Sequence, residues 1–553
     1  MIQPLLSVVV PLLEDTIPSP PPDRPRPPPE WKRIRKARRH AAMRYYCELF
    51  LVTAYTAGTF ALSIFGSYFA GVLDYANPTG MVAVAQLPLI VGLVGRNNVL
   101  SMLTGASYDH INYLHRTSGR VCFFGALAHT FGWWLDRGLG RHAWTWRIYT
   151  AIPAMAGLTA LTLFSFRIIR NRYHQLFRDV HIIAALMFLI MTYFHTPEYR
   201  VWVWPALLLW SLDRAVGLAR MLYVYVRSRG SPTATVELLD ADVLRVSVPV
   251  PFKWKAGTHA YLSVPGVSTI PWEQHPFTFA NIPSPTPGPS PAVFLMRVHG
   301  GFTHQLRNAL DSTISQFPAT VEGPYGEPVD VRHYDSLLCI AGGSGITLCL
   351  SHFLDALAQA DRGRAPTSLR LAWNTRKLAH VRTIAPLLET ALENIANPDV
   401  RIRIDIHVTR SHASDEPTDP NVGFDSTLPF EAKPGEASPL LEHLRHLRGG
   451  SQSSYGSSRA SVSSDGDEPR LSEDELFRSG LGPAAAAYAH VHFGRSLVTE
   501  MIRAEVSEIQ GGGRLGVIVC GPPTLTLDAR CGVNTVMPEA GAEINFHSGS
   551  FCF

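Results

Sequence analysis

Long apolar runs dominate the first half of the chain, whereas short or alternating apolar segments dominate the second half. A membrane-spanning helix needs about 20 mostly apolar residues. Six segments approach this pattern, the second interrupted by Pro88 and the sixth carrying Asp213 and Arg214. The pattern therefore predicts six spanning helices, at Leu49–Leu73, Met81–Val94, Tyr113–Leu135, Tyr149–Phe166, Asp179–Phe194 and Val201–Val224.

From Thr233 onward the pattern is that of a soluble protein. Val243–Val248 alternates between apolar and polar positions, as a half-buried strand does. Similar short segments, separated by Gly and Pro, continue to about Asp330 and predict a small antiparallel β-barrel. Beyond Asp330, apolar strands alternate with helical stretches, which predicts a Rossmann-like α/β domain. The strands expected there are Leu337–Ala341, Leu369–Trp373, Arg401–Val408 and Leu515–Cys520.

These changes divide the chain into a basic, proline-rich tail (1–44), a membrane domain (45–226), a barrel domain (231–330) and a nucleotide-type domain (331–553). A serine-rich, low-complexity insertion at about 410–485 interrupts the last domain, and its composition predicts disorder. We favour an inert surface insertion over a regulatory loop.

Lys and Arg in the loops predict the orientation in the membrane, because cytosolic loops are enriched in these cations. The basic run Trp31–Arg39 precedes the first predicted span, and Arg96 follows the second. Further arginines follow the fourth and sixth spans, and the opposite loops have few cations. Both termini and the soluble half are therefore expected in the cytosol.

Charge, cysteine spacing and the N-terminal apolar run argue against a nucleic-acid partner, a zinc or disulfide site and a signal peptide. The net charge of +4 over 553 residues is too small to indicate a nucleic-acid partner. The 7 cysteines form no C-x-x-C pair, so neither a zinc site nor a disulfide framework is predicted. The apolar run Leu5–Leu13 is too short to span a membrane, and a signal peptide is disfavoured.

Four histidines form a repeated spacing inside two predicted spans. His115 and His129 are fourteen residues apart in the third span, and His181 and His195 are fourteen apart in the fifth. Fourteen residues make nearly four helical turns, so each pair shares a helix face with about 21 Å between its members. Two such helices, expected to run antiparallel, could pair His115 with His181 and His129 with His195. Each layer would suit a six-coordinate haem iron.

The alternative is that each histidine is an isolated core residue satisfied by a nearby carbonyl. His110, His142 and His174 serve as an internal control, since none has a histidine partner fourteen residues away. The repeat at matching depths favours haem ligation.

The soluble half contains a glycine cluster at a strand-to-helix turn. Leu337–Ala341 opens directly into Gly342-Gly-Ser-Gly-Ile-Thr347. Such a turn lets the backbone approach a pyrophosphate at a helix N-terminus, although ordinary tight turns use the same residues. Arg376 follows the next strand and is either a partner of a 2′-phosphate or a solvated surface arginine.

Together these motifs resemble the ferric reductase superfamily, which includes NADPH oxidases, and are most similar to fungal ferric-chelate reductases. The resemblance covers Leu49 to Phe553 apart from the insertion, and rests on Leu103–Tyr108, His275-Pro-Phe-Thr278, Gly342–Thr347 and Cys520-Gly-Pro522 in addition to the histidine pairs. Departures from the family pattern are Pro523-Thr524 after Gly521-Pro522, Ser496 after Gly494-Arg495, and the lack of an extra N-terminal span.

The resemblance implies FAD, NADPH and two b-type haems as cofactors. FAD would be contacted by His275, Pro276, Phe277 and Thr278, with Arg297 and Thr303 as neighbours, and Phe553 would cover the flavin ring. NADPH would bind at Gly342, Gly343, Gly345 and Thr347, with Arg376 at the 2′-phosphate and Cys520, Gly521 and Pro522 near the nicotinamide. No acid–base residue is expected at the site where the acceptor is reduced.

The implied activity is electron transfer from cytosolic NADPH to ferric chelates or siderophores across a lipid bilayer, with cupric ion as an alternative acceptor. Iron-uptake proteins are candidate partners. The plasma membrane is expected, with a vacuolar or other internal membrane as the alternative. A superoxide-generating NADPH oxidase and a non-enzymatic membrane scaffold are the competing functions. The run before His115 and Glu322–Gly326 favour the reductase over the oxidase.

Overall fold

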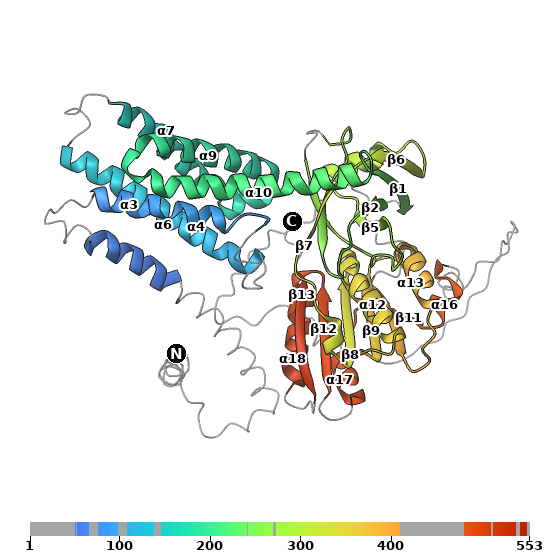
Figure 1. Cartoon of the computed structure of the whole chain (residues 1–553). Helices are drawn as coiled ribbons and strands as arrows, with labels where there is room; N and C mark the ends of the chain where they lie inside the picture. The colour runs from blue at the N-terminus through green and yellow to red at the C-terminus, as the bar shows by residue number, and fades with distance from the viewer. Residues whose placement is uncertain are drawn as a thin grey trace, which may run out of the picture.

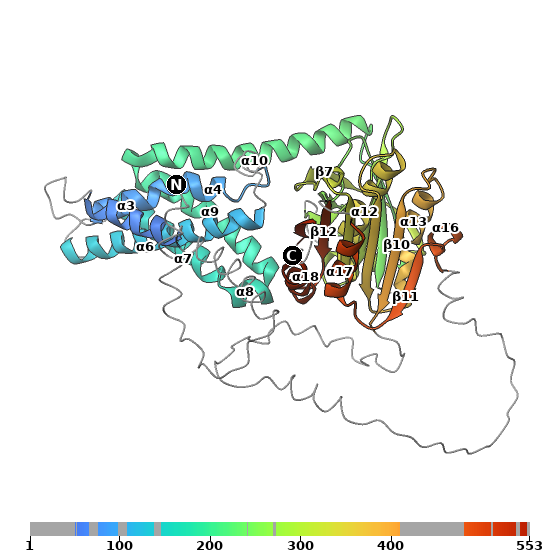
Figure 2. The ribbon, with the colours of Figure 1, turned by 90° about the horizontal axis from the view of Figure 1, so that it is seen from below.

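The computed structural model describes residues 50, 52–65, 76–97, 108–137, 145–240, 242–268, 273–409, 480–509, 513–537 and 542–549. A bundle of helices forms one end of the molecule and two sheet-containing regions form the other (Figures 1 and 2). The long helix α10 (Arg200–Arg227) reaches from the bundle to the sheets. The predicted tail, the predicted insertion up to residue 479 and Phe553 lie outside the described residues.

Three described helices are long and apolar enough to cross a membrane. They are α7 (Trp146–Phe164), α9 (His174–His195) and the segment Pro197–Arg227, which consists of η1 (Pro197–Tyr199) and α10. These correspond to the fourth, fifth and sixth predicted spans.

The first three predicted spans are not among these three helices. The third lies within α6 (Tyr108–Arg137), whose 30 residues include several charges. The second is divided into α3 (Ala76–Ala85) and α4 (Leu87–Gly92), with Pro88 in the first turn of α4, where a missing backbone N–H is tolerated. The first is described as the apolar helix Val52–Phe65. The count of six spanning helices therefore stays a prediction.

The helices pack at close range around a small apolar core. A Cβ on Gly157 of α7 would lie 3.0 Å from the Ala184 carbonyl oxygen of α9, so the missing side chain lets the two backbones approach. Leu87, Cys122 and Leu158 are among the buried residues between the helices. Large apolar side chains on several of these helices point outward, among them Phe124, Phe131, Ile183, Trp204, Leu208 and Leu218.

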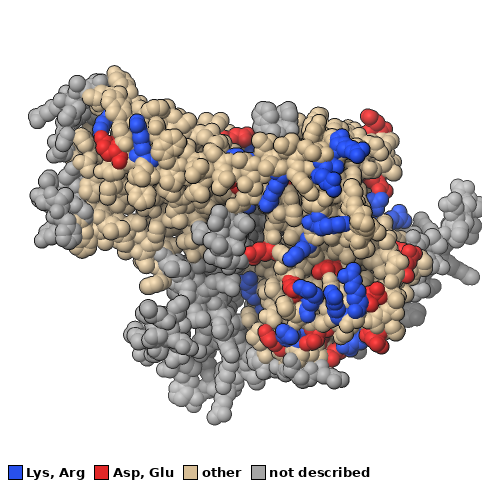
Figure 3. Space-filling model, viewed as in Figure 1, with Lys and Arg blue, Asp and Glu red and all other residues tan. Residues whose placement is uncertain are grey.

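The surface of the bundle differs from that of the sheets. Figure 3 shows mostly uncharged surface over the helical end and interspersed Lys, Arg, Asp and Glu over the sheet-containing end. An apolar surface around a helix bundle is expected where the solvent is lipid, and a mixed-charge surface where it is water. The short helix α8 (Arg167–Arg172) carries arginines at the sheet side of the bundle.

Residues 233–325 form two antiparallel sheets. One has the strand order β5-β2-β1-β6 and the other β4-β3-β7. Burial alternates along β2 as the sequence predicts, and Val236, Leu244, Val246, Phe279 and Phe294 form part of one shared core. Closure of these sheets into a barrel stays a prediction. The strands are β1 (Thr233–Asp240), β2 (Val243–Val250), β3 (His259–Ser263), β4 (His275–Thr278), β5 (Ser290–Arg297), β6 (Ile314–Pro318) and β7 (Thr320–Tyr325), with α11 (Phe302–Asn308) after β5.

Residues 336–549 contain a parallel sheet with the strand order β11-β10-β9-β8-β12-β13. Alternate residues of the fully buried strand β8 face opposite sides. Cys339 belongs to the core under α12 and α13, and Leu338 to the core under α17 and α18. The strands are β8 (Ser336–Gly342), β9 (Ser368–Thr375), β10 (Arg401–Val408), β11 (Ala489–Phe493), β12 (Arg514–Cys520) and β13 (Glu543–Gly549), and the α-helices are α12 (Ile346–Asp361), α13 (Ala385–Leu392), α16 (Pro483–Ala486), α17 (Val498–Glu508) and α18 (Pro523–Val536).

The strand order positions a binding site. The chain runs outward from β8 through β9 and β10 to β11, and then returns to form β12 on the other side of β8. In open parallel sheets ligands bind at the carboxyl ends of the strands where the order reverses, which here is between β8 and β12. All four strands predicted in this region are confirmed: Arg401–Val408 has the predicted bounds, and the bounds of the other three differ by at most two residues.

Replacing Phe279 tests the core of the antiparallel region. Its ring is fully buried and stacks on Trp254 with 4.7 Å between ring centroids. We expect Phe279→Ala to cost about 3–5 kcal/mol through lost burial and a cavity. The exposed Phe493 provides a control, since Phe493→Ala should change stability by about 0.5 kcal/mol or less. Thermal unfolding of the solubilised full chain should show a lower midpoint for the first variant only, and equal midpoints would contradict this account.

Candidate functional site

The four histidines of the repeated spacing meet in two pairs between α6 and α9. The ring centroids of His115 and His181 are 6.4 Å apart. Those of His129 and His195 are 6.3 Å apart. The predicted pairing is therefore present. The expected antiparallel arrangement is wrong, because the first histidine of α6 faces the first of α9, so both helices run in the same direction.

The two pairs lie at different depths of the bundle. His115 and His181 lie on the side where Arg178, which precedes His181 in α9, contacts Glu273 of the sheet region. His195 lies at the opposite end, where its Nδ1 is 3.0 Å from the Arg147 carbonyl oxygen at the start of α7. We call the first pair the inner pair and the second the outer pair.

Hydrogen bonds at Nδ1 orient the rings. Nδ1 of His115 is 2.9 Å from the Ile90 carbonyl oxygen of α4. Nδ1 of His181 is 3.4 Å from the Ser165 hydroxyl, which itself donates to the Leu161 carbonyl. A proton on Nδ1 that is donated to an oxygen leaves Nε2 as the ligand atom, the arrangement typical of metal-binding histidines.

The spacing of each pair fits a metal between the rings. A metal–imidazole bond is about 2 Å long, so two such bonds and the radii of two rings span roughly 6 Å. Both observed separations, 6.4 and 6.3 Å, agree with this value. Gly80 of α3 also approaches the outer pair, since a Cβ there would lie 2.6 Å from Nδ1 of His129. The donor set therefore fits two haem irons, each held by two imidazoles.

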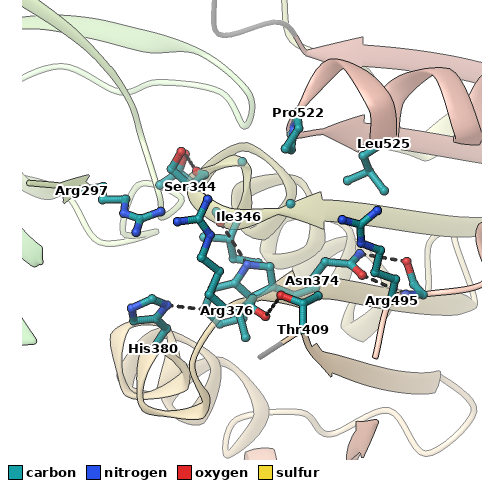
Figure 4. A pocket seen from close by; sticks show the side chains of 18 of the residues that line it. Arg297, Ser344, Ile346, Asn374, Arg376, His380, Thr409, Arg495, Pro522 and Leu525 are labelled. Atoms are coloured by element: carbon teal, nitrogen blue, oxygen red, sulfur yellow. Dashed lines mark hydrogen bonds between the residues drawn. The ribbon is translucent and has the colours of Figure 1, made fainter. Parts of the chain in front are cut away.

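The second candidate site is a cavity of about 530 Å³ at the carboxyl ends of β8 and β12 (Figure 4). The glycine turn after β8 forms one wall, and the Gly521–Leu525 segment after β12 forms another. Gly342, Gly343, Gly345, Thr347, Gly521 and Pro522, all predicted to bind NADPH, line it together with Ser344, Trp373, Asn374 and Thr524.

Close backbone approach explains two of the glycines. A Cβ on Gly345 would lie 2.2 Å from the Cys520 carbonyl oxygen, and a Cβ on Gly342 would lie 2.7 Å from the Pro522 ring. Any side chain at these positions would push the turn away from the end of β12. The turn also leads into the 16-residue helix α12, whose N-terminus favours a phosphate.

Three arginines line the same cavity, namely Arg297, Arg376 and Arg495. In Figure 4 they reach toward the space from β5, from the segment after β9 and from the segment after β11. Arg297 and Arg376 are predicted site residues. Arg495 is not, because the sequence shows it only as an isolated cation in a loop. The adjacent Ser496 is held by Asn374, whose side-chain amide contacts it at 2.9 Å.

Arg297 belongs to an ionic cluster between the two sheet regions. It lies 3.1 Å from the Asp242 carboxylate, which is also 3.2 Å from Nε2 of His380 in the turn Leu378–Thr383. The hydrogen bond from His380 lowers the pKa of Asp242 to about 2, so this carboxylate is ionised at neutral pH. The cluster fixes the antiparallel region beside the cavity.

The predicted flavin motif lies on β4. His275 stacks on Phe302 with 4.4 Å between centroids, and burial lowers its pKa. Pro276 and Phe277 face Tyr261 and Ala260 of β3 in the sheet register, and Thr278 is buried. Thr303 accepts a hydrogen bond from the His299 amide at 2.9 Å, which fixes the start of α11. The structure therefore groups the motif on one sheet, and its contact with FAD stays a prediction.

Cys520 ends β12 directly before Gly521. Its side chain is buried, and burial raises the pKa of the thiol to about 12. The thiol is therefore neutral at physiological pH, which suits a place beside an uncharged ring better than a nucleophilic role. The predicted contributions of Phe553 and of Leu103–Ser107 lie outside the described residues.

Three family models match successive parts of the chain. Residues 79–192 match the model described as ferric reductase like transmembrane component, residues 228–329 match FAD-binding domain, and residues 334–534 match ferric reductase NAD binding domain.

Individual proteins give more distant matches. A probable cell surface ferric reductase of Aspergillus oryzae is 31% identical over 54% of this chain and 43% of its own length. Ferric reductase transmembrane component 4 of Saccharomyces cerevisiae is 28% identical over 84% of this chain and 61% of its own length. The chain thus spans about half the length of these relatives. A ferredoxin NADP+ reductase from Neisseria gonorrhoeae matches 58% of this chain and 98% of its own, with 12% identity and a TM-score of 0.33, too low to carry an argument.

Histidine variants test the two layers separately. We expect His129→Ala to lower the haem content from two per chain to one, because a six-coordinate iron needs both imidazoles. His174→Ala serves as the control, since His174 starts α9 but belongs to neither pair. The measurement is the haem-to-protein ratio of the purified full chain, and an unchanged ratio in His129→Ala would rule out ligation by the outer pair.

A glycine variant tests the cavity. Gly345→Ala places a Cβ against the Cys520 backbone, and we expect the Kd for NADPH to rise at least tenfold, about 1.4 kcal/mol. Gly300→Ala is the matched control, because nothing lies within 4 Å of a Cβ there. Calorimetric titration of the full chain measures both, and equal Kd values for the two variants would contradict the assignment.

Proposed function

Because this chain belongs to the ferric reductase superfamily, we propose that it is a transmembrane metalloreductase that passes electrons from NADPH to ferric chelates across the membrane. FAD and two haems, each held by two histidines, form the path. The observation that carries the proposal is the pair of histidine layers between α6 and α9, at nearly equal separations of 6.4 and 6.3 Å. Isolated core histidines are not expected to form two facing pairs with nearly equal separations.

The bound groups would accept a hydride and pass on electrons one at a time. One NADPH would then reduce two ferric ions and release one proton. The chain's own residues bind and orient these groups. Ile90 and Arg147 hold their histidines through backbone carbonyls, which keeps Nε2 available to iron. These contacts act on the ligands and need no proton transfer at the acceptor.

The cavity residues recognise the nucleotide. The glycine turn and the N-terminus of α12 receive the pyrophosphate, and Arg376 pairs with the 2′-phosphate. The Cys520–Pro522 segment would lie beside the nicotinamide, and Phe553 would cover the flavin ring when no nicotinamide is bound there. FAD contacts the His275–Thr278 motif, with Arg297 and Thr303 as neighbours. Cys520, whose buried thiol is neutral, would add no charge beside the nicotinamide.

The sheet regions and both termini face the cytosol in this proposal. Arg96, Arg178 and Arg220 all contact the antiparallel sheets, so several basic segment ends share one side of the bundle. Arg147 and Glu198 pair at the opposite end. This asymmetry supports a cytosolic location for the sheets. The membrane is the plasma membrane, with an internal membrane as the alternative, and cupric ion is an alternative acceptor.

Sealed vesicles test the proposal. With NADPH on the sheet side and a ferric chelate on the other, a trapped ferrous indicator should report two ferrous ions for each NADPH consumed. His195→Ala should abolish this signal, because it removes one ligand of the outer pair. Superoxide production that consumes NADPH without any ferrous signal would favour the oxidase. No NADPH consumption in protein containing both haems would contradict both functions.

A further inference from the structure

An ion pair between a half-buried arginine and a buried glutamate joins the membrane helices to the antiparallel sheets near the inner pair. Arg96 follows α4, and its Nη1 atom lies 3.2 Å from Oε2 of Glu322 on β7 and 2.6 Å from Oε1 of Gln274. The guanidinium carbon lies 3.7 Å from the centroid of the Tyr261 ring on β3. Glu322 is only 4% exposed, so its charge requires this partner.

The segment that carries Arg96 also orients a haem ligand. Ile90, six residues earlier, provides the carbonyl oxygen that contacts Nδ1 of His115. The segment is fastened to α10, because the Asn97 amide donates to Asp213 at 2.8 Å. A Cβ on Gly95 would lie 3.3 Å from the same carboxylate, which leaves no room for displacement. The position of Arg96 and that of the His115 ring are therefore set by one short stretch of chain.

Helix α10 packs on the other side of Glu322. A Cβ on Gly217 would lie 2.8 Å from Oε1 of Glu322, so the helix backbone covers the carboxylate. Tyr325 donates its hydroxyl hydrogen to Glu322, and Arg220 lies 4.7 Å from the Tyr325 ring centroid. Glu322 is thus held from both the α4 segment and α10.

A second pair repeats the arrangement at the other inner ligand. Arg178 precedes His181 by three residues in α9 and lies 3.6 Å from the Glu273 carboxylate. The same carboxylate is 3.4 Å from Nε2 of His275 in the flavin motif. His181 is therefore three residues from one arginine, and His115 contacts the segment that bears the other. Both arginines pair with a glutamate of the antiparallel region.

We propose that the Arg96–Glu322 pair, assisted by Arg178–Glu273, is a positioning contact that holds the flavin-binding region against the inner haem site. The inference rests on the proposed function. The step it controls moves one electron at a time from the NADPH-reduced flavin to ferric iron, which becomes ferrous. No bond between heavy atoms would form or break, and the reduced flavin would lose two electrons in single steps and release the proton of its N–H bond to water. Arg96 and Glu322 set the position of the flavin-binding region relative to the inner haem site, and they contact neither FAD nor haem themselves.

Conservative variants test whether the ion pair positions the flavin-binding region or is needed for cofactor binding. Glu322→Gln keeps the shape and the acceptor for Tyr325 but removes the charge. In anaerobic rapid mixing with NADPH, we expect flavin reduction at the wild-type rate and haem reduction slowed roughly tenfold, which corresponds to about 1.4 kcal/mol. Arg96→Met should give the same separation. Arg401→Gln, which breaks an exposed pair with Glu508 at 3.1 Å, is the matched control and should change neither rate.

A measurement without NADPH tests the contact directly. Hydrogen exchange should quicken at residues 95–97 and 320–325 in Glu322→Gln and stay unchanged there in Arg401→Gln. The reversed pair, Arg96→Glu with Glu322→Arg, should recover part of the lost haem-reduction rate, because opposite charges again face each other.

The outcomes are distinct. Slowed haem reduction with normal flavin reduction and quickened exchange supports the proposal. Wild-type haem reduction in both single variants overturns it. Equal loss of flavin and haem reduction also overturns it, since the pair would then be needed only for folding. Absence of NADPH-driven haem reduction in the wild-type chain, with both haems bound, contradicts the proposed function rather than this inference.

Discussion

The helical half of the molecule depends on one constraint. The parallel helices α6 and α9 must hold their four imidazoles in two facing pairs. The observed separations of 6.4 and 6.3 Å leave space for one metal atom in each layer, and a small shift of either helix would change that space. The surrounding bundle opposes such shifts. Gly157 lets α7 approach α9, Gly80 lets α3 approach the His129 ring, and the Ile90 carbonyl fixes the His115 ring. Packing, rather than loop structure, therefore sets the geometry of the ligands.

The sheet-containing half depends on a different constraint, which is the close approach of backbones. The turn after β8 can contact the end of β12 only because Gly345 has no side chain, and this contact shapes the cavity. Helix α10 connects the two halves without a break from Arg200 to Arg227. The ionic contact of Glu273 then connects the sheets to α9, which carries His181, and that of Glu322 connects them to the segment after α4, whose Ile90 carbonyl contacts His115. A continuous set of packed elements thus runs from the cavity at the ends of β8 and β12 to the inner pair.

Much of this was predictable because it is local in sequence. The fourteen-residue spacing predicts which histidines share a helix face, and the alternation in Val243–Val248 predicts a half-buried strand. The glycine turn after Leu337–Ala341 predicts the nucleotide cavity. Each depends on helix or strand periodicity, or on the conformational freedom of glycine, and these are properties of neighbouring residues.

The rest depends on contacts between distant segments. The direction of α9 relative to α6 follows from the intervening α7, and considering the two spans alone gave the wrong arrangement. The second predicted span is divided into α3 and α4 because Pro88 lies in the first turn of α4. A hydropathy window cannot tell a proline at the start of a helix from a proline in the middle of a span. Arg495 and the Arg96–Glu322 pair have no local signature, since a single cation in a loop looks the same whether it is solvated or buried.

The central claim is that electrons from NADPH reach two haems and leave to ferric iron. A reduced-minus-oxidised absorption spectrum of membranes that contain the chain tests this most directly, recorded without oxygen on adding NADPH and then a ferric chelate. The account predicts b-type haem bands that appear with NADPH and fade when the chelate is added. Bands that only oxygen discharges, or the absence of haem bands in folded protein, would contradict it.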